Sequence, residues 1–171
     1  MLRKGLVLAA LLLLPAVAGA QVRGPWEVTL SGNGVTPSRF NGFQAGGNAS
    51  LGYFFNDSIE VGVRQTINYN DIGGPVSFNG ITRLALDLHL PLGDQNQFLP
   101  FGGVNIGYVY GQGIRDTWEA APEAGLKWFV GPDVFIFGQV EYQFFFRSGG
   151  GVNNAFKNGQ FVYTLGVGFR F

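Results

Sequence analysis

The sequence lacks the residues on which many small secreted domains and metal sites depend. It has no cysteine, one methionine and one histidine (His89) among 171 residues. Without cysteine the fold cannot use the disulfides that stabilise many small secreted domains. With a single histidine and no thiol, we expect neither a transition-metal site nor a cofactor held by such ligands.

Charge is scarce as well. Charged residues make up 13% of the chain, against roughly 25% in typical soluble domains. Lys+Arg and Asp+Glu both number 11, so the formal net charge is +0. No basic excess points to a nucleic-acid partner. The chain instead has 28 glycines and 17 phenylalanines, so something other than a charged surface must make it compatible with its surroundings.

The first twenty residues have the three-part pattern of a secretory signal peptide. Arg3 and Lys4 precede an apolar run over 6–14, and Ala-Gly-Ala at 18–20 provides the cleavage pattern. The run is shorter than the roughly 20 apolar residues that a membrane-spanning helix needs, although a retained anchor is the alternative. The sequence therefore predicts a signal peptide over 1–20 and one domain over 21–171. Without Arg3 and Lys4, nine basic residues face 11 acidic ones, a net charge of −2.

Beyond Gln21 no stretch keeps a helical period, but apolar and polar residues alternate repeatedly. This period of two is the side-chain period of a β-strand. In the segment 58–70, for example, Ile59, Val61 and Val63 share one face, and Glu60 and Arg64 share the other. Eight segments have this pattern, near 26–31, 43–53, 58–70, 81–90, 104–110, 118–128, 134–147 and 163–171.

The connections between these segments alternate in length. Two of the even-numbered ones are tight turns (56–58 and 131–133), and the third, at 91–97, is intermediate. Their Gly, Pro, Asn and Asp residues are typical of turns. The odd-numbered connections are mostly longer and rich in Gly and Asn, at about 33–42, 71–80, 111–117 and 148–159. Short turns on one side and longer loops on the other are typical of outer-membrane barrels.

The last segment, YTLGVGFRF, keeps its alternation to the final residue. Its apolar face consists of Tyr163, Leu165, Val167, Phe169 and Phe171. Aromatic residues also gather near both ends of the other predicted strands, as in the aromatic belts of membrane barrels. A soluble sandwich or lipocalin is the alternative, but it does not explain the aromatic belts or the terminal phenylalanine. The sequence therefore predicts an all-β fold, an eight-stranded antiparallel up-and-down transmembrane β-barrel.

Over residues 22–171 the chain resembles the small eight-stranded outer-membrane barrels of the OmpX and OmpA transmembrane-domain type. The resemblance implies that the C-terminal alternation, Tyr163 to Phe171, is a signal read by the barrel-assembly machinery. It also implies a monomer in the bacterial outer membrane, in contact with a lipopolysaccharide-type outer leaflet, with extracellular loops and periplasmic termini. It implies no cofactor and names no surface partner.

Some barrels of this size are lipid A-modifying enzymes, which use a histidine with a serine and a carboxylate near the outer leaflet. His89 is predicted on the inner face near the periplasmic end, which is the wrong face and the wrong end for that chemistry. Ser58, Ser77 and Ser148 are predicted in turns or loops without a histidine in reach, and a nucleophile needs a positioned base. A non-catalytic protein is therefore expected.

The predicted inner face carries long polar side chains. Eight strands leave an interior that side chains can fill, which favours a packed polar lumen in a structural or surface-interaction barrel. A narrow pore for small solutes is the alternative. Glycines within the strands are expected to make room in this lumen or to allow curvature. These are Gly46, Gly47, Gly107, Gly125, Gly166 and Gly168.

The turn at 131–133 determines how the segments 118–128 and 134–147 pair, and therefore which of their inward residues lie opposite each other. If it has three residues, Val130 pairs with Val134, and Glu123 then lies opposite Glu141. Two carboxylates about 5 Å apart repel by roughly 3 kcal/mol at an effective dielectric of about 20, so a cation must lie beside them or one must be protonated.

The segment 58–70 is expected across the lumen from the segment 134–147, with Arg64 at a height similar to that of Glu141, so Arg64 can supply that cation. A ten-residue loop over 71–80 would also place Arg64 opposite Asp87. We therefore predict a mid-lumen cluster of Arg64, Asp87, Glu123 and Glu141, with Arg83 or Lys127 assisting, that plugs the barrel and holds its shape. A looser, water-bridged arrangement is the alternative.

Overall fold

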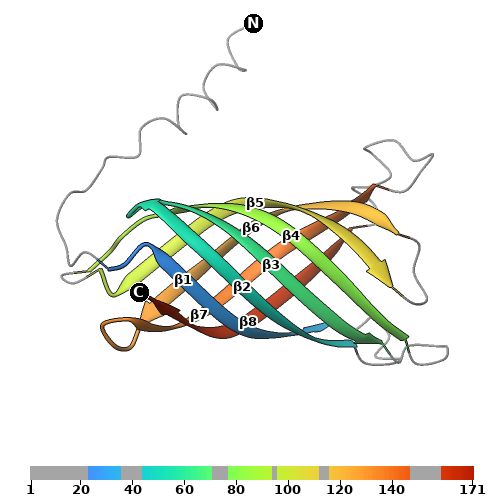
Figure 1. Cartoon of the computed structure of the whole chain (residues 1–171), viewed down its shortest axis with the longest axis horizontal. Helices are drawn as coiled ribbons and strands as arrows, with labels where there is room; N and C mark the ends of the chain where they lie inside the picture. Colours follow the sequence, from blue (N-terminus) through green and yellow to red (C-terminus); the bar gives the residue numbers. More distant parts are fainter. Residues whose placement is uncertain (1–22, 36–43, 71–76, 94–95, 112–115, 147–158) are drawn as a thin grey trace, which may run out of the picture.

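The computed structural model describes residues 23–35, 44–70, 77–93, 96–111, 116–146 and 159–171. Each strand pairs antiparallel with the next, and β8 pairs with β1 to close the barrel (Figure 1). The predicted all-β, eight-stranded antiparallel barrel is confirmed, whereas the predicted signal peptide lies outside the described residues. No helix among the described residues is long and apolar enough to cross a membrane. The strands are β1 (Trp26–Val35), β2 (Gln44–Asn56), β3 (Ile59–Asn70), β4 (Ser77–His89), β5 (Phe98–Gly111), β6 (Thr117–Phe129), β7 (Val134–Phe146) and β8 (Gln160–Arg170).

The two ends of the barrel differ. One end, called the turn end below, holds the connections β2–β3, β4–β5 and β6–β7 and the C-terminus (Figure 1). The opposite end, called the loop end, is the end at which β1, β3, β5 and β7 finish. The β3–β4 connection is shorter than predicted, because Ser77 already pairs with Asn70 at the start of β4. The stretch 77–80 has no apolar alternation of its own, which explains why its sequence resembles a loop.

Apolar side chains cover the outer face of the barrel. Twelve outward aliphatic residues are 41–74% exposed. On a soluble protein an apolar surface of this kind would favour aggregation, whereas a lipid-facing barrel requires it. The residues concerned are Leu30, Leu51, Val63, Ile67, Leu84, Leu86, Val104, Ile106, Leu126, Ile136, Leu165 and Val167.

Exposed aromatic residues form a belt at each end, as the sequence predicts. At the turn end Trp26 packs edge-on against Tyr53, with ring centroids 4.9 Å apart. At the loop end Tyr108 and Trp118 pack in the same way at 5.3 Å. Other members of the belts are Phe55, Phe98, Trp128, Phe169 and Phe171 at the turn end, and Tyr69, Phe78, Tyr110, Phe146, Phe161 and Tyr163 at the loop end.

Inside the barrel, large side chains lie opposite glycines of the neighbouring strand. Phe135 is paired with Gly168, and Phe101 with Gly125. A methyl group on either glycine would overlap the phenyl ring opposite, so these glycines make room in the lumen as predicted. Gly47 differs, because it faces outward with no other atom near its Cβ position. The same pairing of large residue and glycine relates Phe137 to Gly166, Asp87 to Gly103 and Arg83 to Gly107.

The C-terminal segment closes the barrel. The backbone N–H of Trp26 donates to the carbonyl of Phe171 at 3.0 Å, and the N–H of Phe171 donates to Trp26 at 2.8 Å. On the other side of β8, the N–H of Arg170 donates to the carbonyl of Asp133 at 2.8 Å. The last residues are therefore tied into the sheet rather than frayed, which accounts for an alternating pattern that continues to Phe171.

Candidate functional site

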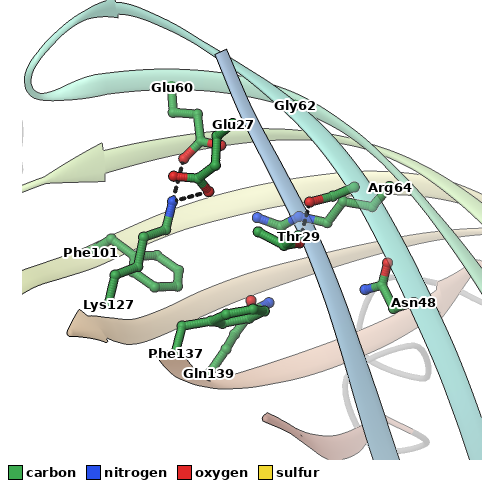
Figure 2. Close-up of a pocket in the computed structure, with 11 residues that line it drawn as sticks. Glu27, Thr29, Asn48, Glu60, Gly62, Arg64, Phe101, Lys127, Phe137 and Gln139 are labelled. Atoms are coloured by element: carbon green, nitrogen blue, oxygen red, sulfur yellow. Dashed lines mark hydrogen bonds and ion pairs between the residues drawn. The ribbon is translucent and has the colours of Figure 1, made fainter. Parts of the chain in front are cut away.

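The lumen contains three groups of ion pairs, arranged one above another from the turn end towards the loop end. In the first group Lys127 of β6 reaches across the lumen to β1 and β3. Its Nζ lies 2.5 Å from Glu27 Oε1 and 2.8 Å from Glu60 Oε2. Figure 2 shows the ammonium group between the two carboxylates. All three side chains are buried, so each charge depends on the others for its stabilisation.

The second group is centred on Arg64 of β3. Its NH2 group lies 2.6 Å from Asp87 Oδ2 on β4, and its NH1 group lies 2.7 Å from Glu123 Oε2 on β6. One guanidinium fork thus joins two buried carboxylates on different strands. Such charge-assisted hydrogen bonds are the strong ones in proteins, and lysine could not reproduce the planar fork.

Arg83 of β4 forms the third group, nearest the loop end. Its Nε donates to Glu119 Oε1 of β6, and its NH2 lies 3.6 Å from Glu141 Oε1 of β7. NH1 also donates to Thr66 Oγ1 at 2.9 Å. This group therefore connects β3, β4, β6 and β7 around the lumen.

Amide side chains complete the second and third groups, in each of which one arginine faces two carboxylates. Asn105 Nδ2 donates to Glu123 Oε2 at 2.6 Å, and Gln139 Nε2 donates to the same oxygen at 2.9 Å. Gln143 Nε2 donates to Glu141 Oε1 at 2.6 Å. Buried carboxylates need such donors, because an unpaired polar group in the interior costs free energy.

The predicted cluster is brought together, but its pairing differs from the prediction. Glu123 lies opposite Glu141, as the three-residue turn indicates. The prediction that Arg64 lies opposite Asp87 is wrong: Arg64 faces Arg83, because β4 starts earlier than predicted. Arg64 nevertheless contacts Asp87 through its long side chain.

The six predicted residues also divide among the groups in an unexpected way. Glu141 is paired with Arg83 rather than Arg64, and Lys127 belongs to the separate first group. Sequence reasoning did not identify Glu60 and Glu119 as partners in these groups, nor the pairing of Glu27 with Lys127. The sequence does indicate that these residues face the lumen, because each alternates with outward-facing apolar neighbours.

His89 lies at the turn end of the lumen, with its side chain fully buried. Its ring lies between those of Phe54 and Phe101, and Nε2 is 3.4 Å from Glu60 Oε2. The backbone of His89 lies beside Ser58, because the His89 N–H donates to the Ser58 carbonyl at 2.7 Å. Among the described residues, however, none forms a hydrogen bond with either ring nitrogen. The arrangement therefore provides no serine activated by this imidazole.

The other predicted polar sites give no further candidate. Ser77 begins β4 rather than lying in a loop, and Ser148 lies outside the described residues. Within the described ranges, no group of three or more His, Asp or Glu side chains is arranged to hold a metal ion.

At the turn end the lumen also contains a cluster of apolar side chains, which the sequence analysis did not predict. Six inward side chains form what we call the aromatic layer, and each is 0–8% exposed. The prediction of a polar lumen throughout is therefore incomplete. In runs such as Val134–Phe137 both faces of the strand are apolar, so alternation does not show which side points inward. The aromatic layer consists of Phe54, Leu99, Phe101, Phe129, Phe135 and Phe137.

A small cavity of about 20 Å³ lies between the first and second ion-pair groups. Its walls include Glu27, Asn48 and Arg64 on one side and Gln139 on the other (Figure 2). Ser50, Phe101 and Phe137 also line it. The volume of the cavity is comparable to that needed by about one water molecule. Between these two groups side chains therefore leave little empty space, in keeping with the filled interior expected of an eight-stranded barrel.

The fold is similar to those of solved outer-membrane barrels. The N-terminal β-barrel domain of OprF from Pseudomonas aeruginosa aligns at 18% identity and a TM-score of 0.62, covering 88% of this chain and 100% of that chain. OprG from the same organism aligns at 17% and 0.61, with coverage of 87% and 97%. Neisserial surface protein A aligns at 14% and 0.59, with coverage of 88% and 100%.

No family model matches the sequence, and no curated protein matches it either. At these identities the likeness concerns the fold alone. The resemblance to small eight-stranded outer-membrane barrels that the sequence suggested is confirmed at this level: the chain has the fold of these barrels.

Proposed function

We propose that the chain is an integral protein of the bacterial outer membrane with a non-catalytic role, in envelope stabilisation or in surface interactions. The observation that carries this proposal is the distribution of side chains. Ion pairs and amides fill most of the lumen, whereas exposed aliphatic residues such as Leu30 and Leu165 cover the outside, at 60% and 74% exposure. This distribution, polar within and apolar without, is suited to lipid surroundings.

The backbone supports the same proposal. Because β8 pairs with β1, the sheet has no free edge. In a bilayer core every backbone N–H and C=O must find a partner within the protein, and for sheets only a closed barrel provides this. The two aromatic belts mark the two membrane interfaces in this proposal.

The proposed orientation places the turn end in the periplasm. Outer-membrane barrels have short periplasmic turns and longer extracellular loops, and both described chain ends lie at the turn end. The proposal includes export by a cleaved signal peptide over 1–20. It also includes recognition of the C-terminal strand by the assembly machinery, supported by the outward exposure, between 45% and 74%, of Tyr163, Leu165, Val167, Phe169 and Phe171.

A structural role fits the lumen better than a pore. The charged side chains of opposite walls are bonded to one another, as in the contact of Lys127 with Glu27 and Glu60, and the aromatic layer fills the turn end. These contacts fix the barrel shape and leave the loop end available to a lipopolysaccharide-type leaflet and to surface partners. Function would then depend on the outer loops, as is common for loops held by a rigid scaffold.

Cell fractionation and envelope assays test the proposal together. We expect the protein in the outer-membrane fraction as a monomer, processed after Ala20, and a deletion strain with increased sensitivity to detergent or altered adhesion. Recovery as a soluble periplasmic protein would contradict the membrane location. Stable single-channel currents from the wild-type protein in planar bilayers would favour the narrow pore instead.

A further inference from the structure

The aromatic layer is densely packed. Phe135 is fully buried and lies between Phe129 and Phe137, with ring centroids 5.0 Å and 6.1 Å away. Leu99, which is 1% exposed, belongs to the same cluster. Gly168 leaves the space that the Phe135 ring occupies. The layer is thus built from complementary large and small residues, and together with the buried ring of His89 it occupies the turn end of the lumen.

Two cations lie against the rings of the aromatic layer. The Lys127 ammonium is 5.2–5.5 Å from the ring centroids of Phe54, Phe101 and Phe135. The Arg170 guanidinium lies 3.6 Å from the ring centroid of Phe54. Cation–π attraction holds such groups against the rings.

Arg23 places a further cation at the mouth of the turn end. It lies 3.5 Å from the ring centroid of Phe129. It also donates hydrogen bonds to the carbonyl groups of Pro132 and Asn96, at 3.0 Å and 3.2 Å, on two different turns. Arg23 thus links the residues preceding β1 to two turns and covers the layer from outside.

The ion-pair groups differ from this layer in how they respond to water. Their carboxylates, guanidinium groups and amides can exchange a protein partner for a water molecule, whereas phenyl rings cannot. The cavity between the first and second groups already has the volume of about one water molecule. Apolar constrictions in channels, by contrast, block ions by excluding water.

We propose that the aromatic layer, and not the ion-pair network, is the barrier that makes the lumen impermeable to ions. The barrel is then a polar interior closed at its turn end by an apolar floor. The ion pairs stabilise the wall, and Phe135, at the centre of the layer, is the residue on which impermeability depends most. This inference goes beyond the proposed structural role, because it assigns closure and stability to different residues.

Conductance measurements on three variants test the proposal. In planar bilayers we expect the wild type, Phe135→Leu and Arg64→Gln to remain closed, because each retains an apolar layer. Phe135→Ser should show discrete current steps, because it removes the central ring and places a hydroxyl group in the layer. A closed Phe135→Ser barrel, or a conducting Arg64→Gln barrel, would overturn the proposal. Conduction by the wild type would instead contradict the proposed function.

Thiol labelling provides an independent measurement that does not require a current. The chain has no cysteine, so Ser50→Cys introduces a single thiol beside the lumen cavity. With the aromatic layer intact, we expect no reaction with a membrane-impermeant thiol reagent added at the turn side of oriented vesicles. In the Phe135→Ser background the same thiol should react. Labelling from the turn side with Phe135 present would refute the proposal, as would protection in the Phe135→Ser background.

Discussion

Replacement of Arg64 by alanine tests the stabilising role of the ion-pair network. The substitution removes both charge-assisted hydrogen bonds of the second group, at 2.6 Å and 2.7 Å. It leaves Asp87 and Glu123, whose side chains are 4% and 0% exposed, without their cation. Removing one partner of a buried ion pair costs about 3–5 kcal/mol. Because two carboxylates lose their partner at once, we expect the free energy of unfolding to decrease by an amount in the upper part of that range.

Equilibrium unfolding in urea measures this effect on barrels refolded into lipid vesicles. The chain has three tryptophans, all at the aromatic belts, so their fluorescence reports the loss of the lipid-exposed wall. Adding Glu123→Gln to Arg64→Ala should restore part of the lost stability, because it removes one of the two unmatched charges. Adding Glu141→Gln should restore less, because Glu141 is paired with Arg83 and not with Arg64.

Asp133→Asn is the matched control, since it removes an exposed charge at the turn end. Exposed substitutions of this kind usually change stability by no more than about 0.5 kcal/mol. If Arg64→Ala has no larger effect than Asp133→Asn, the second group does not stabilise the barrel. If Glu141→Gln and Glu123→Gln restore stability equally, the pairing described for Arg64 is wrong.

Three further predictions concern packing, assembly and closure. Gly168→Ala should lower the unfolding free energy by about 1–3 kcal/mol, because the added methyl group overlaps the Phe135 ring. Gly47→Ala is the control and should change it little, because Gly47 faces outward. Equal effects of the two substitutions in urea unfolding would contradict the described packing of Phe135 against Gly168. Phe171→Ala should reduce the amount of protein recovered in the outer membrane more than Trp128→Ala does. Each of these rim side chains contributes only on the order of 1.5–3 kcal/mol to the folded barrel, so a larger effect at Phe171 would reflect assembly. Equal recovery of the two variants would argue against a C-terminal assembly signal. In detergent the folded protein should migrate differently on gels before and after boiling, because a closed barrel resists unfolding; identical migration would count against closure.

The strands could be predicted because the barrel has two chemically different faces. In the segment around Val61 and Val63, every second residue faces outward and the residues between them face the lumen, so the sequence alternates clearly. The boundary of β4 was harder to predict. Residues 77–80 combine polar inward positions with Phe78 and a glycine, and only the pairing with β3 shows that they belong to the strand.

The lumen contacts were predictable only where a short turn fixes the register. The turn at 131–133 is local, so Glu123 opposite Glu141 follows from counting residues. No comparable constraint links β3 to β4, and a different loop length shifts Arg64 along its partner strand. The contact of Arg64 with Asp87 still forms, because an arginine side chain can reach a residue that is not directly opposite. Contact is therefore less sensitive to register than backbone pairing is.

The aromatic layer could not be predicted from alternation, because some strands are apolar on both faces near the turn end. Phe135 and Phe137 point inward, while Val134 and Ile136 point outward, yet all four are hydrophobic. The better signal is glycine on the neighbouring strand. Gly166 and Gly168 of β8 lie opposite the two rings, so a glycine at an inward position indicates a large side chain facing it.

These observations suggest why the lumen, rather than the outer face, determines how stable this barrel is. Lipid tails are about as apolar as leucine, so outward aliphatic side chains gain little by packing on one another in a bilayer. Inside, the side chains are removed from both lipid and bulk water, and each charge must be matched by a partner from another strand. Lys127 connects β6 to β1 and β3, and Arg64 connects β3 to β4 and β6. A substitution in the lumen therefore disturbs strands on opposite walls at once, whereas a conservative change on the outer face affects only a strand and its neighbours.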